Sequence, residues 1–225
     1  MPWPGMVQHQ LPPVAVAGRG KTMGRCEELQ NVLIVLDPAS AEGDLTALAI
    51  SCPSCASGRL RPWGYARTRV LRGLRGARRR VRPRRGRCRD CAATHVLLPA
   101  DVAPRRADTI EVVAAALLAH HAGKGHWVIA ADLDVPLDTV RSWLRRITAR
   151  AEWLRHQATV WAHRCDPELP AITPTGSRIG DALEALGVAV SAHRRQLGTS
   201  ASAWQILAMI AGGRLLAPLP PARSG

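Results

Sequence analysis

The sequence has no phenylalanine and a single tyrosine among its 225 residues, although it has seven tryptophans. Nearly half of the residues are apolar, but most of these are alanine, leucine and valine, which favours small helical modules over a large β-sandwich. No apolar run approaches the roughly 20 residues of a membrane-spanning helix. The N-terminus also lacks the charged start and apolar core of a secretory signal. We therefore expect an intracellular protein without a membrane partner or a small-molecule substrate.

Lysine and acidic residues are scarce as well. Of the 31 basic residues all are arginine except Lys21 and Lys124, and the formal net charge is +14. From Arg59 to Arg89 there are 14 arginines and no acidic residue. A surface this positive attracts polyphosphates. Because the segment contains no counter-charge, we expect its arginines to repel one another unless an anion binds.

Four of the six cysteines form two Cys-x-x-C pairs, Cys52/Cys55 and Cys88/Cys91. Two such pairs supply four thiolates for a tetrahedral zinc ion, and inside a cell paired cysteines are more often metal ligands than disulfides. The 32 residues between the pairs exceed the spacing of compact sites, which predicts an inserted hairpin. We predict one structural Zn²⁺ and keep a redox dithiol as the alternative. His95 is either a substitute ligand or a packing residue.

The N-terminal residues 1–25 are rich in proline and glycine and show no periodicity, so we expect them to be disordered or to precede a true start at Met23. Gly20-Lys21-Thr22 resembles the end of a phosphate-binding loop, but Ala15 stands where the motif needs glycine. Residues 26–50 form a lead segment without an assigned structure. Cys26 and Cys165 have no partner nearby and are expected to have no role.

A first helix is predicted after Pro104. Asp108 reads as its N-cap and Glu111 as its capping-box partner, and Gly123 and Gly125 end it. One face of this helix carries the apolar and histidine side chains at helical spacing, namely Ile110, Val113, Ala114, Leu117, Leu118 and His121.

Residues 126–145 match the spacing of a DNA-binding helix-turn-helix. Ile129 and the small Ala130 allow the two helices to approach closely, and Asp134 occupies the left-handed turn position. Pro136 is expected to start the second helix, where its missing N–H costs nothing. In this motif the second helix enters the major groove with its N-terminal part.

The DNA contacts predicted from this geometry are of two kinds. Arg141 is expected to contact a base, because arginine can bond guanine O6 and N7 together, whereas Thr139, Arg145 and Arg146 are expected to touch phosphate. The outward residues of the second helix are Leu137, Asp138, Arg141, Ser142 and Arg145. The basic segment between the cysteine pairs adds Arg78, Arg79, Arg80, Arg82, Arg84, Arg85 and Arg87.

The second helix continues as a heptad seam through Val140, Leu144, Ile147, Ala151, Leu154, Ala158 and Trp161. A Pro-rich linker follows at 164–175, and the same alternation returns at Ile179, Leu183, Leu186, Val190, His193 and Leu197. We favour an antiparallel helical pair inside one chain and keep a homodimer through the 140–161 seam as the alternative. A last apolar segment runs from Trp204 to Ala211.

The segments CPSC, RPWGYARTR and RRRVRPRRGRCRDC, followed by the helix-turn-helix, resemble the N-terminal zinc-ribbon and DNA-binding region of bacterial insertion-sequence transposases. The stretch from Val32 to GGRLLAP (212–218) also resembles a group of actinobacterial proteins that carry the same ribbon, the segment HVLLP (95–99) and the helix-turn-helix, without the rest of a transposase. The resemblance implies double-stranded DNA binding at the nucleoid, in transcriptional regulation or mobile-element recognition. The alternatives are an accessory or truncated transposase subunit and an RNA-binding zinc ribbon.

We predict no enzymatic activity. A transposase of this class needs three separated carboxylates to hold two Mg²⁺ ions, and no sheet pattern brings together the acids that follow the helix-turn-helix. These acids are Glu152, Asp166, Glu168, Asp181 and Glu184.

The predicted fold class is mainly α with a small β zinc ribbon. The ribbon with its Arg-rich hairpin spans 51–103, and the helix-turn-helix with an extended recognition helix spans 104–163. After the linker, a C-terminal helical hairpin covers 176–217.

Overall fold

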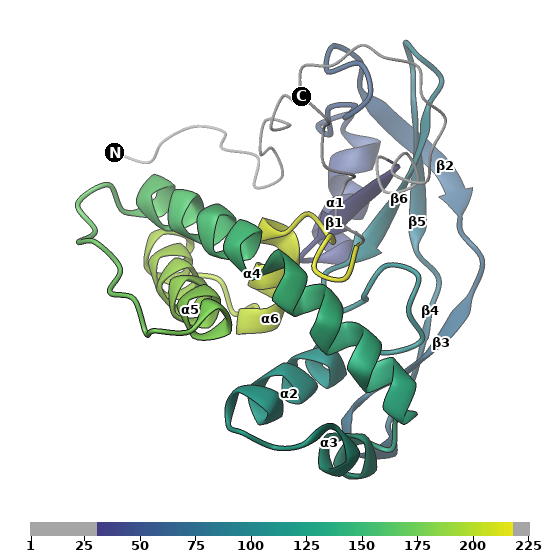
Figure 1. Cartoon of the computed structure of the whole chain (residues 1–225). Helices are drawn as coiled ribbons and strands as arrows, with labels where there is room; N and C mark the ends of the chain where they lie inside the picture. Colours follow the sequence, from purple (N-terminus) through teal and green to yellow (C-terminus); the bar gives the residue numbers. More distant parts are fainter. Residues whose placement is uncertain (1–30, 218–225) are drawn as a thin grey trace, which may run out of the picture. The chain divides into compact units, whose positions relative to one another are not determined.

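The computed structural model describes residues 31–217, in which six α-helices accompany a small mixed sheet (Figure 1). The chain divides into two compact units. We call residues 31–68 with 82–99 the sheet unit, and residues 69–81 with 100–217 the helical unit. The predictions for residues 1–25, including Gly20-Lys21-Thr22, and for Cys26 lie outside the described residues.

The sheet unit is built on four strands in the order β1-β6-β5-β2. Strand β1 runs parallel to β6, whereas β6 pairs with β5 and β5 with β2 in antiparallel fashion. Leu60 at the start of β2 lies opposite Cys88 at the end of β5. The strands are β1 (Val32–Val35), β2 (Leu60–Tyr65), β5 (Arg84–Cys88) and β6 (Thr94–Pro99).

The lead segment left unassigned by the sequence supplies β1 and helix α1 (Pro38–Thr46). Asp37 caps α1, since its carboxylate accepts the backbone N–H groups of Ala39 and Ser40 at 2.9 and 3.2 Å. The four consecutive apolar residues VLIV form β1, whose backbone hydrogen bonds are made to the neighbouring strand β6.

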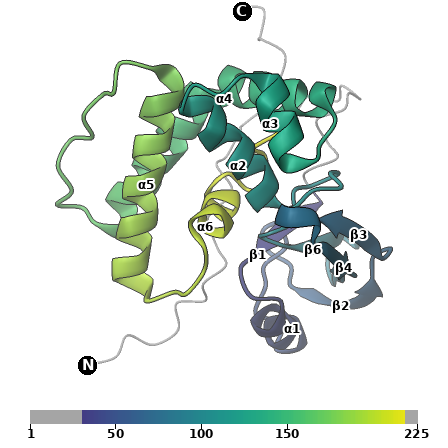
Figure 2. The ribbon, with the colours of Figure 1, turned by 90° about the horizontal axis from the view of Figure 1, so that it is seen from below.

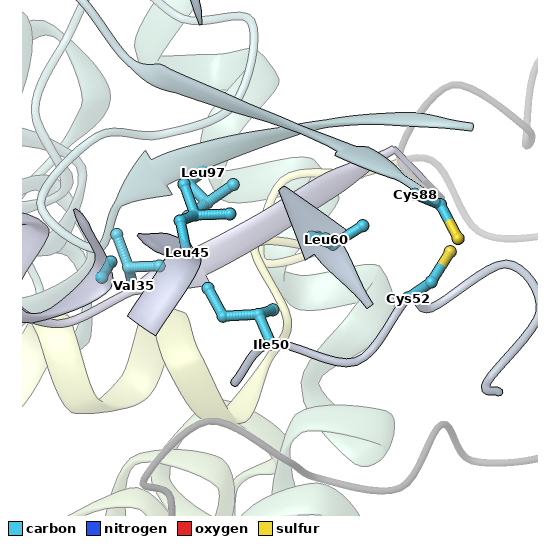
Figure 3. Packing of buried hydrophobic residues seen from close by; sticks show 8 residues of the cluster. Val35, Leu45, Ile50, Cys52, Leu60, Cys88 and Leu97 are labelled. Carbon is cyan, nitrogen blue, oxygen red and sulfur yellow. The ribbon is translucent and has the colours of Figure 1, made fainter. Parts of the chain in front are cut away.

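The core of the sheet unit is small and runs into the cysteine pairs (Figure 3). Gly86 on β5 is required there, because an added Cβ would lie 2.9 Å from Cδ2 of Leu45 and 3.2 Å from Cβ of Leu60. The buried members of this core are Val35, Ala41, Leu45, Ile50, Cys52, Leu60, Cys88 and Leu97.

The helical unit contains five helices and one hairpin (Figure 2). Its core is apolar and centres on the fully buried Trp143, with Val113, Ile129, Val140 and Leu207 also buried. The elements are β3 (Arg69–Arg72), β4 (Arg78–Val81), α2 (Ile110–His121), α3 (His126–Leu133), α4 (Leu137–Cys165), α5 (Arg178–Leu197) and α6 (Ala203–Ile210). The apolar segment predicted from Trp204 onward is therefore α6. None of these helices is both long and apolar enough to cross a membrane.

Helix α2 begins differently from the prediction. Thr109, not Asp108, is its N-cap residue, and no side chain caps it. The carboxylate of Asp108 is engaged elsewhere, because it accepts a hydrogen bond of 2.8 Å from Nε of Arg72 on β3. The predicted apolar face is buried except at its C-terminal end, where Leu118 and His121 are exposed.

Helices α4 and α5 pack together along the predicted seam, but they run in the same direction, so the prediction of an antiparallel pair is wrong. Asp166, just past the end of α4, pairs with Arg195 in the last turn of α5 at 3.0 Å. Trp161 in the last turns of α4 lies beside His193, with ring centroids 5.7 Å apart. The connection 166–177 is long enough to return along α5, since 12 extended residues span about 40 Å and 20 helical residues about 30 Å. Periodicity defines the seam, but it does not define the direction of the second helix.

The β3–β4 hairpin is bound within the helical unit, so the structure divides the Arg-rich segment that the sequence treated as one ribbon. The backbone N–H of Arg72 donates to the carbonyl of Ala107 at 2.7 Å, and the N–H of Thr109 donates to the carbonyl of Arg72 at 2.9 Å. Arg79 on β4 forms an ion pair with the buried Asp101. These contacts join residues that are more than 20 positions apart, so local sequence patterns could not predict them.

Candidate metal centre and basic surfaces

The four cysteines of the two pairs gather at one end of the sheet unit. Their Sγ atoms all lie within 4.8 Å of one another, with 3.7 Å between Cys52 and Cys91 and 3.6 Å between Cys55 and Cys88. Figure 3 shows the sulfurs of Cys52 and Cys88 turned toward each other at the edge of the core. A tetrahedral ion with metal–sulfur bonds of about 2.3 Å requires sulfurs about 3.8 Å apart. The cysteines form no disulfide, and their spacing fits such an ion.

The two pairs have the same local backbone. In each pair the residue after the second cysteine is an alanine with positive φ, 61° at Ala56 and 59° at Ala92. The N–H of the first cysteine donates to a carbonyl beyond the turn, from Cys52 to Gly58 and from Cys88 to Ala93, both at 2.8 Å. This repeated turn is why two short motifs far apart in the sequence present their sulfurs in the same way.

Two residues outside the pairs support the sulfurs. His95 on β6 is fully buried, and its Nε2 lies 3.4 Å from Sγ of Cys52. It is therefore a packing residue that can hydrogen-bond a sulfur, and it does not belong to the four-ligand set. Gly58 lies against Cys88, since an added Cβ would come within 2.4 Å of that Sγ.

The sulfurs differ in acidity when no cation is present. Burial raises the pKa of the Cys52 thiol to about 12, whereas the backbone N–H of Gly58 lowers the pKa of Cys55 to about 7. At neutral pH the protein alone therefore cannot hold all four groups as thiolates. A divalent cation would favour the four-thiolate state and release protons as it binds.

The predicted arginine contacts fall into two sets. Arg78, Arg79 and Arg80 lie on β4 in the helical unit, whereas Arg82, Arg84, Arg85 and Arg87 lie in the sheet unit.

The expectation that the arginines of 59–89 lack a counter-charge is wrong for three of them. Arg84 donates to both carboxylate oxygens of Glu42 at 2.6 and 2.9 Å, and Arg72 and Arg79 pair with Asp108 and Asp101. The acids come from distant segments, which is why the local sequence did not reveal them.

Helices α3 and α4 meet at the turn that the sequence predicted. Asp134 is left-handed, with φ 50° and ψ 49°, and the N–H of Val135 donates to the carbonyl of Ala130 at 3.1 Å. Ile129 and Ala130 are buried, as are Val140 and Trp143 on α4. Pro136 is the N-cap residue of α4, so the helix begins at Leu137, one residue later than expected.

The predicted contacts on α4 differ in accessibility. Asp138, Arg141 and Arg145 are exposed, whereas Leu137, Thr139, Ser142 and Arg146 are partly buried. Nη1 of Arg141 lies 3.6 Å from the Asp138 carboxylate, and its guanidinium carbon lies 5.9 Å from the ring centroid of Trp127 on α3.

Arg146 is already engaged inside the helical unit. Its Nε donates to Oγ of Ser142 at 3.3 Å and its Nη1 to the carbonyl of Leu216 at 3.5 Å.

Comparison of the chain with protein-family models, with curated proteins and with solved structures gave no match. The transposase-related resemblance therefore stays a prediction, as do the expected intracellular location and the expected absence of enzymatic activity. The site is described by its own geometry.

Sequence reasoning missed several residues of these surfaces. Gly58 was given no place at the sulfurs, the choice for His95 between substitute ligand and packing residue was left open, and Trp63 and Tyr65 were assigned no role. Of these residues, only Gly58 could have been noticed in the sequence. It lies three positions after Cys55, and a glycine near a ligand often marks a close approach of the backbone.

Proposed function

We propose that the protein is a zinc-stabilised, double-stranded-DNA-binding protein of transposase-related origin, which acts in transcriptional regulation or in recognition of mobile-element ends. In this proposal one structural Zn²⁺ is held by Cys52, Cys55, Cys88 and Cys91. The sulfur spacing close to the tetrahedral value supports zinc, as does the all-thiolate donor set, which is typical of closed structural sites. The role of the ion is to hold the sheet unit together.

The observation that carries DNA binding is the close-packed α3–α4 pair with an exposed arginine on the first turns of α4. The buried Ala130 and the left-handed Asp134 give the short turn that a helix-turn-helix requires, and Arg141 projects from the N-terminal half of α4 with about half of its side chain exposed. Trp127 and Asp138 limit the orientations of its guanidinium group. An arginine held in this way is suited to a bidentate contact with guanine.

The remaining basic groups fit a phosphate-contacting role. Arg145 on α4 and Arg78 and Arg80 on β4 are exposed and belong to the helical unit. Affinity that comes from such groups falls steeply with salt, because counterions are released when arginines neutralise phosphates.

The test begins with zinc-loaded protein and sheared genomic DNA at near-physiological salt, followed by sequencing of the retained fragments. Recovery of a shared motif is the expected result, and uniform recovery would contradict specific recognition. On the recovered motif, Arg141→Ala should weaken binding about 5- to 150-fold, the equivalent of about 1–3 kcal/mol for a bidentate pair, while binding to unrelated duplexes changes little.

The matched control is Arg155→Ala. Arg155 lies on the same helix, is exposed, and is paired with Glu152. Its loss should leave DNA binding unchanged. If Arg141→Ala weakens binding to every sequence equally, Arg141 contacts only phosphate and the assignment of base recognition is wrong.

A further inference from the structure

Strand β2 in the sheet unit carries two aromatic side chains that the core does not use. Trp63 is 38% exposed and Tyr65 49% exposed, although large aromatic groups are usually buried. A register shift between Pro62 and Tyr65 gives β2 one residue more than β5, and Gly64 in this bulge has φ 71°. Bulges commonly re-aim side chains at functional surfaces.

Two arginines lie close to each of these rings. The guanidinium carbons of Arg61 and Arg87 lie 5.2 and 4.6 Å from the centroid of Trp63. Those of Arg82 and Arg84 lie 5.0 and 4.6 Å from the centroid of Tyr65. We call Trp63, Tyr65 and these four arginines the stacking strip.

The two arginines on each ring differ in what else they contact. Arg84 is bound by Glu42 and by the carbonyl of Gly64 at 2.8 Å, and Arg87 donates to the carbonyl of Ala92 at 3.3 Å. Arg61 and Arg82 are exposed, and within the described residues neither has an acidic partner. Each ring is thus held by one anchored arginine and accompanied by one cation that is available to a ligand.

We propose that the stacking strip binds a single-stranded segment of nucleic acid, with unpaired bases stacked on Trp63 and Tyr65 and with phosphates bound by Arg61 and Arg82. Aromatic rings beside cations provide the two interactions that a single strand needs, which are a surface for base faces and charge for the backbone. A paired duplex hides its base faces in the stack, so the strip would discriminate against it. The strip lies in the sheet unit alone and does not depend on duplex recognition by α4.

The test measures fluorescence anisotropy of labelled oligonucleotides with the full-length, zinc-loaded protein at near-physiological salt. The probes are oligo(dT) and oligo(U) of about 12 nucleotides, within the range of single-strand sites, and a duplex of matched length. Wild-type protein should bind the single strands, and Trp63→Ala and Tyr65→Ala should each weaken that binding about tenfold. Trp63→Phe should retain most of it, and duplex binding should not change.

Trp127→Ala is the matched control, because Trp127 is 71% exposed but lies in the helical unit. It should leave single-strand binding unchanged. The double variant Arg61→Gln/Arg82→Gln keeps both rings and should weaken single-strand binding and reduce its salt dependence. If Trp63→Ala loses its zinc, this double variant still tests whether the strip binds single strands, because it leaves both rings in place.

The proposal is overturned if the wild-type protein binds no single strand, if both ring variants bind as the wild type does, or if they weaken duplex binding equally. Tighter binding of oligo(U) would assign the strand to RNA, and equal or tighter binding of oligo(dT) would assign it to DNA. Loss of duplex recognition in Arg141→Ala with intact single-strand binding keeps the two proposals separate, since each can fail without the other.

Discussion

The sheet unit and the helical unit reach a folded state by different physical means. The sheet unit has about 55 described residues and a core of eight buried side chains, two of which are cysteines. A domain of this size buries little apolar surface and is marginally stable, so a bound metal can add much of its stability. The helical unit buries a larger set of apolar side chains, among them the fully buried Trp143.

The comparison shows that arginine is tolerated in both units for different reasons. In the helical unit the basic β3–β4 hairpin is held by the acids Asp101 and Asp108. In the sheet unit Glu42 holds Arg84, and two of the exposed arginines, Arg61 and Arg82, lie over aromatic rings.

Removal of the proposed zinc ion should unfold the sheet unit and leave the helical unit folded. Chelation or Cys88→Ser should remove the free energy of zinc binding from the stability of the sheet unit. In small zinc domains this binding free energy is about 10–16 kcal/mol. Amide hydrogen exchange should show loss of protection in β5 and β6 with α4 and α5 still protected. Cys165→Ser is the control, because Cys165 is a free thiol at the end of α4. Protected β5 amides after chelation would show that sulfur ligation is dispensable.

Trp143→Ala should destabilise the helical unit and leave the sheet unit folded. Trp143 is fully buried, and such a truncation costs about 3–5 kcal/mol because it leaves a cavity. The free energy of unfolding of the helical unit should fall by that amount, while native mass spectrometry still finds one bound zinc. Release of the zinc by this variant would mean that the two units do not fold separately.

Gly58→Ala should weaken metal binding without changing any ligand. Its Cβ would lie 2.4 Å from Sγ of Cys88, so the sulfur or the turn must shift. Groups that support metal ligands typically change affinity about 10- to 100-fold, which competition with a chromophoric chelator can measure. Gly43→Ala in α1 is the control, because no atom lies within 4 Å of its added Cβ. Equal affinities in the two variants would contradict the close approach at Gly58.

The helical unit should lose stability in mild acid through His193. Burial, with a smaller contribution from Arg194, lowers the pKa of His193 below its ordinary value of 6.5, and within residues 31–217 neither ring nitrogen has a hydrogen-bond partner. The unfolded chain therefore binds a proton that the folded state resists, and stability falls as the pH drops below about 6.5. His193→Leu should flatten this slope in denaturant titrations followed by exchange of α5 amides. An unchanged slope would assign the pH dependence to other groups.

The smallest effect is expected at the two turns after the cysteine pairs. Ala56→Gly and Ala92→Gly should each stabilise the sheet unit by about 0.5–1 kcal/mol, because glycine adopts positive φ without strain. In the helical unit the same change should have the opposite sign, with Ala115→Gly in α2 costing about 1 kcal/mol. Thermal unfolding of zinc-loaded variants measures both. Destabilisation by Ala92→Gly would contradict the left-handed turn.

Features that depend on neighbouring residues were predictable. The cysteine pairs, the left-handed Asp134 and the buried stripe of α4 follow from two-residue spacing, turn chemistry and helical period, and the structure agrees with each. Features that depend on distant partners were not. Nothing near VLIV indicates that β1 pairs with β6, and nothing near Arg84 indicates Glu42.

The sequence alone was enough to predict which four cysteines could bind a metal, the positions of helices α2 to α5, and most of the faces that these helices bury. These properties follow from side-chain chemistry and from the repeat of the backbone, both of which act over a few residues. The direction of α5, the division of the arginines between two units, and the approach of arginines to Trp63 and Tyr65 became known only from the folded structure. These features depend on contacts between segments that are far apart in the chain. Such contacts stabilise the protein only after the chain has folded and brought the segments together.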